Sequence, residues 1–272
     1  MTLVLLAFIA VYSRGWYRLW KTLPKLISVW RLAAFVGGIV SLWLATESPL
    51  AEWDEQLLTA HMVQHLLLMI VAAPLILLGA PSITLLHGLP RNVVRDALAP
   101  LIRSRPVHRL ADMCAHPAVC WLAASLVVIG WHVPGAFDLA LRSNWWHEIE
   151  HACFFTAGLL FWWPVIRPWP SVTGSPRWTV PLYLFLATLP CDALSAFLAF
   201  SDRVVYRSYL SADGGFNLSP LQDQALAGAL MWVTVTFAYL IPALVVTFQI
   251  LSGPRNLAYA ADAVARDGAD DR

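Results

Sequence analysis

The sequence feature that most constrains the fold is a stretch from Leu57 to Ala80 that contains no charged residue. A stretch of this length can cross a bilayer as a single helix. It nevertheless begins with two histidines, His61 and His65, which are four residues apart. On a helix this spacing places both imidazoles on one face, one turn apart. Ionisable side chains are costly inside a membrane, so the pair predicts a function for this end of the helix.

The composition places the whole chain in the membrane class. Of its 272 residues, 59% are hydrophobic and only 13% are charged, whereas a soluble domain carries about 25% charged residues. The four cysteines form no C-x-x-C motif, so neither a disulfide framework nor a zinc knuckle is indicated. No basic motif suggests nucleic acid as a partner. The 14 tryptophans gather at the ends of apolar segments, as they do at membrane interfaces.

Seven apolar segments predict an all-α, polytopic membrane bundle of seven transmembrane helices. We expect one domain over residues 1–254 and a disordered cytoplasmic tail over 255–272. The first segment is short and needs the Trp16–Trp20 region to reach across a bilayer. It has neither a basic leading region nor a small-residue cleavage site, so we do not interpret it as a cleaved signal peptide. The expected segments are 2–12, 30–46, 57–80, 117–132, 145–166, 178–200 and 224–251.

The distribution of cations predicts the orientation of the bundle. The connections after the first, third and fifth segments, together with the tail, hold 15 of the 18 Lys and Arg residues. The opposite side holds only Arg142, Arg203 and Arg207. By the positive-inside rule, the N-terminus lies outside and the C-terminus lies in the cytoplasm.

This topology brings the polar residues of several segments to the outer end of the bundle. His132 closes the fourth segment there, and the motif WWHEIEH supplies His147 and His151 at the start of the fifth, again four residues apart. Asp192 lies toward the outer end of the sixth segment, and Asp223 begins the seventh. Intramembrane ionisable groups face the interior or a wet cavity and pair with one another, so we expect these residues to meet.

Two His-x-x-x-His pairs on facing helices predict a metal site. Helical bundles hold metals between helices in this way, and imidazole suits copper, zinc, iron and nickel. The alternative is an interhelical hydrogen-bond network, which would stabilise the bundle by about 1 kcal/mol per contact. The predicted ligands are His61, His65, His147, His151, Asp192 and Asp223, with His132, Glu150 and Gln224 as supporting residues. Neutral imidazole is the ligand form, so binding should weaken below about pH 6.

Sulfur-bearing side chains near these segments are expected to be packing residues. Met62, Met69 and Met231 fall on apolar segments, and Cys191 precedes Asp192. A thioether or thiol beside the site would favour Cu(I). His87, His108 and His116 fall in the predicted cytoplasmic loop, where we expect them to be solvated.

The run HMVQHLLLMIVAAPLILLGAP resembles the signature of the multi-spanning bacterial CtaG family of cytochrome c oxidase assembly factors. The likeness continues through HEIEHACFFTAGLLFWWPVI, the Asp192 region with VVYRSYL, and SPLQDQALAGALMWV, and covers Trp30 to Leu251. The sequence departs from the family pattern in its short first segment and in Ala73-Pro74, where Pro-Pro is expected. The family positions match His61, His65, His147, His151, Asp192, Asp223 and Gln224.

The resemblance implies a role in forming the metallated oxidase of a bacterial respiratory chain, by handling copper. The residues form no catalytic constellation beyond the predicted metal site, so we do not expect an enzyme. The implied partners are oxidase subunits or other copper chaperones, and the implied location is the bacterial inner membrane. Zinc and iron are also compatible with the ligand types. Two alternatives stay open at this point: a membrane oxidoreductase that holds haem or a di-iron centre, and a transporter that uses the same polar residues as a pathway.

Overall fold

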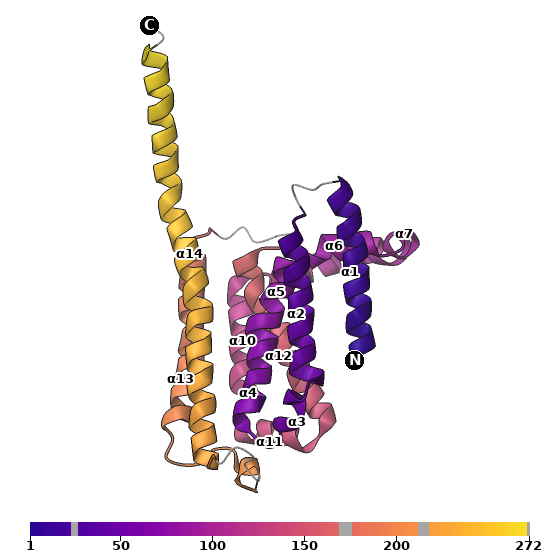
Figure 1. The fold of residues 1–272 in the computed structure, drawn as a ribbon, viewed down its shortest axis with the longest axis vertical. Coiled ribbons are helices and arrows are strands. Elements are labelled where there is room, and N and C mark those ends of the chain that lie inside the picture. The colour runs from indigo at the N-terminus through magenta and orange to yellow at the C-terminus, as the bar shows by residue number, and fades with distance from the viewer. Residues whose placement is uncertain (23–26, 169–175, 212–217, 271–272) are drawn as a thin grey trace.

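The protein is a bundle of long helices joined by short ones. The computed structural model describes residues 1–22, 27–168, 176–211 and 218–270, with side chains described up to residue 252. Within these residues the chain is all-helical, and the long helices run along one common direction (Figure 1). The long helices are α1 Thr2–Thr22, α2 Val29–Glu47, α4 Leu58–Leu66 with its continuation to Leu78, α10 Pro117–Trp131, α12 Asn144–Ile166, α13 Thr179–Phe200 and α14 Pro220–Asp270.

Each predicted segment corresponds to one of these long helices. The first differs most, because α1 extends to Thr22 and takes in the Trp16–Trp20 region. The last helix, α14, continues through the alanine-rich tail to Asp270, as the high helix propensity of alanine favours. Disorder of residues 255–272 in solution stays a prediction, because their side chains lie outside the described part of the chain.

The structure supports a membrane protein, but fewer than seven of its described helices are long and apolar enough to be clear membrane spans. Five of the described helical stretches are long and apolar enough to cross a membrane, and a sixth counts if α9 (Arg105–Cys114) and α10 form one span bent by 70°. α1 is not among them, and its second half carries Arg14, Arg18 and Lys21. The seven-span count and the orientation of the termini therefore stay predictions.

Short helices connect the long ones at the two ends of the bundle. At one end lie α3 (Leu50–Trp53), α11 (Pro134–Arg142) and the 3₁₀ turn η3 (Arg207–Ser211), as Figure 1 shows for the first two. Near the other end are α6 (Pro81–Gly88), α7 (Arg91–Val93), the π-helical η2 (Val94–Leu98) and α8 (Ala99–Ile102). Two of them, α6 and α11, begin with proline, which suits a first helical turn because its missing N–H has no partner there in any case.

The predicted third segment contains an irregularity that sequence patterns did not indicate. Between α4 and α5 (Ala73–Leu78) the chain forms a π-helix, η1, from Leu67 to Ala72, in which the N–H of Ala73 donates to the carbonyl of Leu68. Pro74 has no N–H, so in this register it cannot donate to the carbonyl of Met69. The indole Nε1 of Trp162 donates to that carbonyl instead, at 3.0 Å. A side chain of α12 thereby supplies the hydrogen bond that the irregular turn after His65 leaves unmade at the Met69 carbonyl.

Two hydrophobic clusters hold the long helices together. The larger lies between α4, η1, α5, α10, α12, α13 and α14, and includes Phe161 and Tyr239. The smaller joins α1, α2 and α5, where the Tyr12 and Phe35 rings stack with centroids 3.8 Å apart. The Tyr12 hydroxyl donates to the carbonyl of Gly79 at 2.6 Å, so its polar end is satisfied inside the cluster.

The contact between α12 and η1 depends on the absence of a side chain at Gly158. A Cβ at this position would lie 2.9 Å from Cα of Met69 and 3.0 Å from Cβ of Ala73. We expect Gly158→Val to lower the free energy of unfolding by about 1–3 kcal/mol, because the two helices must move apart. Thermal unfolding of the detergent-solubilised protein, followed by tryptophan fluorescence, measures this effect.

Gly130 provides the matched control, because a Cβ there would have no neighbour within 4 Å. Gly130→Ala should leave the melting temperature unchanged or raise it slightly, since alanine favours helix. Equal melting temperatures for Gly158→Val and the unmodified protein would contradict the close packing of α12 on η1.

Candidate metal site

Two helices, α4 and α12, bring two pairs of imidazoles together at one end of the bundle. His61 and His65 lie one turn apart on α4, as their spacing predicts, and both are buried, with 0% and 5% exposure. His147 and His151 lie one turn apart on α12, which runs beside α4. The ring centroids of His61 and His147 are 5.4 Å apart, and those of His65 and His151 are 5.8 Å apart. The predicted meeting of the two histidine pairs is therefore present in the structure.

Glu150 lies between the two histidines of α4. Its side chain is fully buried, and each carboxylate oxygen faces a different imidazole. Oε2 is 3.6 Å from Nε2 of His61, and Oε1 is 3.6 Å from Nε2 of His65. The sequence predicted Glu150 as a supporting residue, and the structure places it at the centre of the cluster.

Asp54 is a member of the cluster that sequence reasoning missed. It follows α3 and is 1% exposed, with Oδ2 at 3.4 Å from Nε2 of His147. Burial raises the pKa of the Asp54 carboxyl, and the nearby His147 and His61 act in the opposite direction. In the sequence it stands in the acidic run EWDE, and nothing there separates it from its exposed neighbours Glu52 and Glu55.

The side chains form two overlapping groups with the spacing of a metal centre. One group is Asp54, His61 and His147, and the other is His61, His65 and Glu150; within each, the ligand atoms lie within 4.8 Å of one another. Both groups share His61. Ligand atoms at about 2.0–2.1 Å from a tetrahedral metal lie roughly 3.3 Å apart. The separations of 3.4 and 3.6 Å are close to that value.

The cluster contains many buried polar atoms without a protein hydrogen-bond partner among the described residues. A buried group of this kind costs about 1–3 kcal/mol, so native proteins contain few of them. Here they converge on one place, with donor types that suit a transition metal. They are both ring nitrogens of His61 and His65, Nε2 of His132, His147 and His151, both carboxylate oxygens of Glu150, and Oδ2 of Asp54.

His132 lies beside the cluster with its ring orientation set by the backbone. Its Nδ1 donates to the carbonyl of Val128 at 2.6 Å, because that carbonyl can only accept, and this leaves Nε2 as the unprotonated nitrogen. The His132 and His65 ring centroids are 6.4 Å apart. The Tyr206 hydroxyl donates to the His132 carbonyl at 3.1 Å and fixes the end of α10. Similar bonds orient the imidazoles of many metal ligands.

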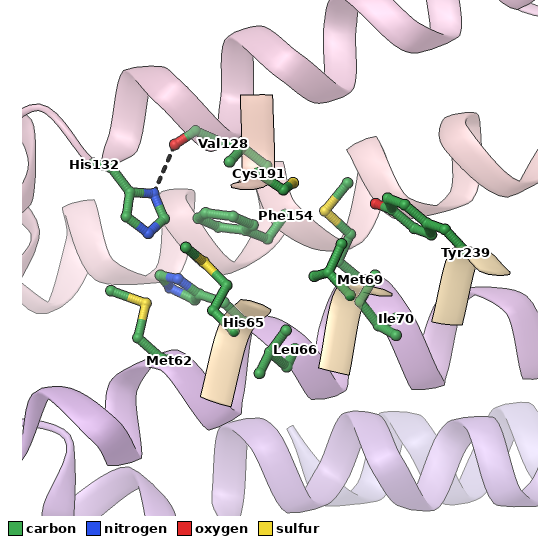
Figure 2. Close-up of a pocket in the computed structure, with 12 residues that line it drawn as sticks. Met62, His65, Leu66, Met69, Ile70, Val128, His132, Phe154, Cys191 and Tyr239 are labelled. Carbon is green, nitrogen blue, oxygen red and sulfur yellow. Dashed lines mark hydrogen bonds between the residues drawn. The ribbon is translucent and has the colours of Figure 1, made fainter. Parts of the chain in front are cut away.

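A small pocket extends from these imidazoles toward the middle of the bundle. Figure 2 shows His65 and His132 at one end, with Met62, Met69 and Cys191 among the side chains around it. Its volume is about 30 Å³. The ring of Phe154 stacks on His65 with centroids 3.9 Å apart and forms part of the wall. Thioether and thiol side chains thus line the same pocket as the two imidazoles.

Asp223 and Gln224 perform structural tasks in this structure. The Asp223 carboxylate accepts hydrogen bonds from the backbone N–H groups of Leu58 and Thr59 at 2.6 and 3.1 Å, and from the Thr59 hydroxyl at 2.6 Å. It therefore caps the N-terminus of α4 from the start of α14. Gln224 accepts from the N–H of Val205 at 2.7 Å and fixes the preceding loop. Asp223 joins neither metal-spaced group among the described residues, and its role as a metal ligand stays a prediction.

Asp192 is also placed apart from the two groups. It is half-buried on α13, next to Cys191. Its Oδ1 has no hydrogen-bond partner among the described residues. The sequence placed Asp192 with the histidines because it lies toward the same end of its helix, but neither metal-spaced group includes it.

Comparisons with known proteins agree with the sequence resemblance. The family model described as "Cytochrome c oxidase caa3 assembly factor (Caa3_CtaG)" matches residues 10–252. Uncharacterized proteins of Mycobacterium bovis and Mycobacterium tuberculosis are each 27% identical over 217 residues, and one of Mycobacterium leprae is 24% identical over 215 residues. These alignments cover 75% of this chain but 31% of each relative, so the chain spans about a third of their length. No solved structure matches the chain.

The cap at Asp223 generates a test that separates a structural carboxylate from a ligand. Asp223→Ala removes the acceptors of two N–H groups at the start of α4, so we expect the free energy of unfolding to fall by about 1–3 kcal/mol. The metal content of the folded protein, measured by mass spectrometry after purification, should not change. Asp202→Ala, at an exposed position before η3, is the control for loss of a carboxylate at this end. Loss of metal without loss of stability would assign Asp223 to the metal instead.

Proposed function

Because the chain belongs to the family of cytochrome c oxidase caa3 assembly factors, we propose that it binds copper and assists the metallation of a bacterial cytochrome c oxidase. Copper is cargo in this proposal, held by side chains at the end of the bundle that the cation distribution assigns to the outside. The protein acts by holding and passing on an ion, and the proposal requires no catalysed reaction. Its partners are the oxidase subunits that receive the ion, or copper chaperones that supply it, in the bacterial inner membrane.

The observation that carries the proposal is the position of Glu150 between His61 and His65. Both of its oxygens lie 3.6 Å from an imidazole nitrogen, and all of these atoms are buried without a hydrogen-bond partner among the described residues. A hydrogen-bond network would bring N–H and oxygen to about 2.7–3.2 Å. The observed spacing is longer and fits ligands that share an ion. We therefore favour metal binding over the network.

The arrangement of the two groups suggests a route for exchange. His147 is the more accessible histidine, with 23% of its side chain exposed, whereas His61 is fully buried. An ion that first meets Asp54 and His147 can pass inward by ligand replacement at the shared His61, to reach His65 and Glu150. A carrier needs a path of this kind, because a fully sealed site would retain its ion.

The sulfur-lined pocket favours copper over zinc as the cargo. Thioether and thiol ligands suit Cu(I), and Met62, Met69 and Cys191 line the pocket that begins at His65. The histidines alone would accept zinc or iron as readily, so this pocket is the feature that narrows the choice.

The same pocket argues against a haem site. Its volume of about 30 Å³ is the space of one or two water molecules, far below that of a macrocycle.

Transport across the bundle also lacks support from the described residues. The pocket wall beyond the imidazoles includes Leu66, Ile70 and Val128, so it offers few polar groups to an ion on its way through the bundle. Holding an ion at one end explains the arrangement better than either alternative.

We expect a His61→Ala/His65→Ala double variant to lose copper. Each substitution removes a buried nitrogen ligand, and the shared His61 belongs to both groups, so the affinity should fall by about tenfold or more. Copper per protein is measured by mass spectrometry after reconstitution with Cu(I) under reducing conditions. If the unmodified protein retained iron or zinc in place of copper, the cargo would be that metal and not copper.

His87→Ala/His108→Ala is the matched control, because both of these histidines are exposed and lie outside the cluster. It removes the same number of imidazoles and should keep the copper content of the unmodified protein. Equal copper binding by the two double variants would show that the proposed site is wrong.

Oxidase activity in a strain that lacks the protein tests the cellular role. We expect low activity and copper-deficient oxidase, with partial recovery when copper is added to the medium, because excess ion bypasses a delivery step. Expression of the unmodified protein should restore activity, and the His61→Ala/His65→Ala variant should not. Full restoration by that variant would favour a scaffolding role over copper delivery.

A further inference from the structure

A wide basic basin lies near the end of the bundle opposite the histidines. It is formed by the second half of α1 and by the short helices α6, α7, η2 and α8, which Figure 1 shows beside the main bundle for α1, α6 and α7. Its volume is about 1320 Å³. The cations that line it are Arg14, Arg18, Lys21, Arg91, Arg95 and Arg103.

The charge of the basin is largely uncompensated. Among the residues that the structure describes, no carboxylate lines the basin. Arg95 pairs with Asp96, which is not a lining residue, at 2.7 Å. Arg18 donates to the carbonyl of His87 at 2.8 Å. A concave surface lined by one sign of charge concentrates counter-ions, and guanidinium groups match phosphate oxygens in geometry. The basin is therefore suited to a phosphate group.

An apolar groove adjoins the basin on the same two helices. It lies between the first half of α1 and α6, has a volume of about 430 Å³, and shares the lining residue Leu89 with the basin. Its side chains are all apolar, namely Leu3, Val4, Ala7, Phe8, Val11, Leu85 and Leu89. Along α1 the surface thus changes from apolar to basic within one helix.

The wall that carries both surfaces is closely packed. A Cβ at Gly15 would lie 1.9 Å from the carbonyl oxygen of Thr84, and one at Gly88 would lie 1.9 Å from that of Val11. The backbones of α1 and α6 touch at these two glycines. The groove and the basin are therefore held in a fixed relation to each other.

We propose that this face of α1 and α6 binds an anionic phospholipid, with its phosphate in the basic basin and an acyl chain in the apolar groove. A free anion would fill only the basin, and a neutral lipid would leave the cations uncompensated. An anionic phospholipid satisfies both surfaces at once. The positive-inside rule assigns this end to the cytoplasm, and basic pockets on that side of membrane proteins bind acidic headgroups. The lipid would tie α1, which is not among the clear spans, to the bundle.

The test uses the full-length protein, delipidated in a neutral detergent. Phosphatidylglycerol, phosphatidylcholine with the same acyl chains, and glycerol 3-phosphate are added separately, and the melting temperature is followed. A ligand that binds only the folded state raises this temperature, and we expect a rise of about 2–4 °C with phosphatidylglycerol. The other two compounds should give less than half of that rise. An equal effect of phosphatidylcholine, or of glycerol 3-phosphate, would overturn the proposal.

Two variants separate the parts of the site, and a third is the control. Arg91→Gln/Arg103→Gln weakens the basin, and Ala7→Trp fills the groove; each should lose most of the rise with phosphatidylglycerol. Arg203→Gln/Arg207→Gln, toward the opposite end of the bundle, should keep it. A full rise in either of the first two variants would contradict the assignment. Copper content should be unchanged in all three, so this test stands apart from that of the proposed function.

Discussion

The cost of burying ionisable side chains in an apolar bundle is the constraint on which the rest of this structure depends. His61, His65 and Glu150 lie between helices with almost no access to water, and none has a hydrogen-bond partner among the described residues. Such groups persist only if something compensates their lost hydration. The proposed shared metal ion would do so for all three at once, and this requirement links the burial of the cluster to its proposed function.

The residues around the cluster hold it in place without joining it. Asp223 caps α4, so that the start of α14 fixes the helix that carries His61 and His65. Tyr206 fixes the end of α10 through the carbonyl of His132, and the Tyr209 hydroxyl donates to the carbonyl of Asp54 at 2.6 Å. Trp162 satisfies the carbonyl that the π-helical turn and Pro74 leave open. These bonds come from segments far apart in the sequence, so the site is an outcome of the assembled bundle.

The two ends of the bundle have opposite chemistry. One end gathers imidazoles and carboxylates in a largely buried cluster, and the other presents a basic basin that opens beside α1 and α6. A cation suits the first, and an anionic headgroup suits the second. The uneven distribution of Lys and Arg, which predicts the orientation from the sequence, thus also assigns the two proposed ligands to opposite ends. Neither site requires residues of the other.

The sequence by itself determined the helical class, the approximate limits of the long helices and the two histidine pairs, because hydrophobic runs and i, i+4 spacing are local properties. It did not determine which carboxylates meet the histidines. Asp54 and Glu150 do so, whereas Asp223 caps a helix, because the packing angle and depth of each helix decide which way a carboxylate points. The π-helical turn after His65 likewise arises from one proline and the indole of Trp162, which lies 93 residues away from the carbonyl it binds. Only the tertiary structure brings such partners together, since a separation of many turns along the chain does not determine the distance in space.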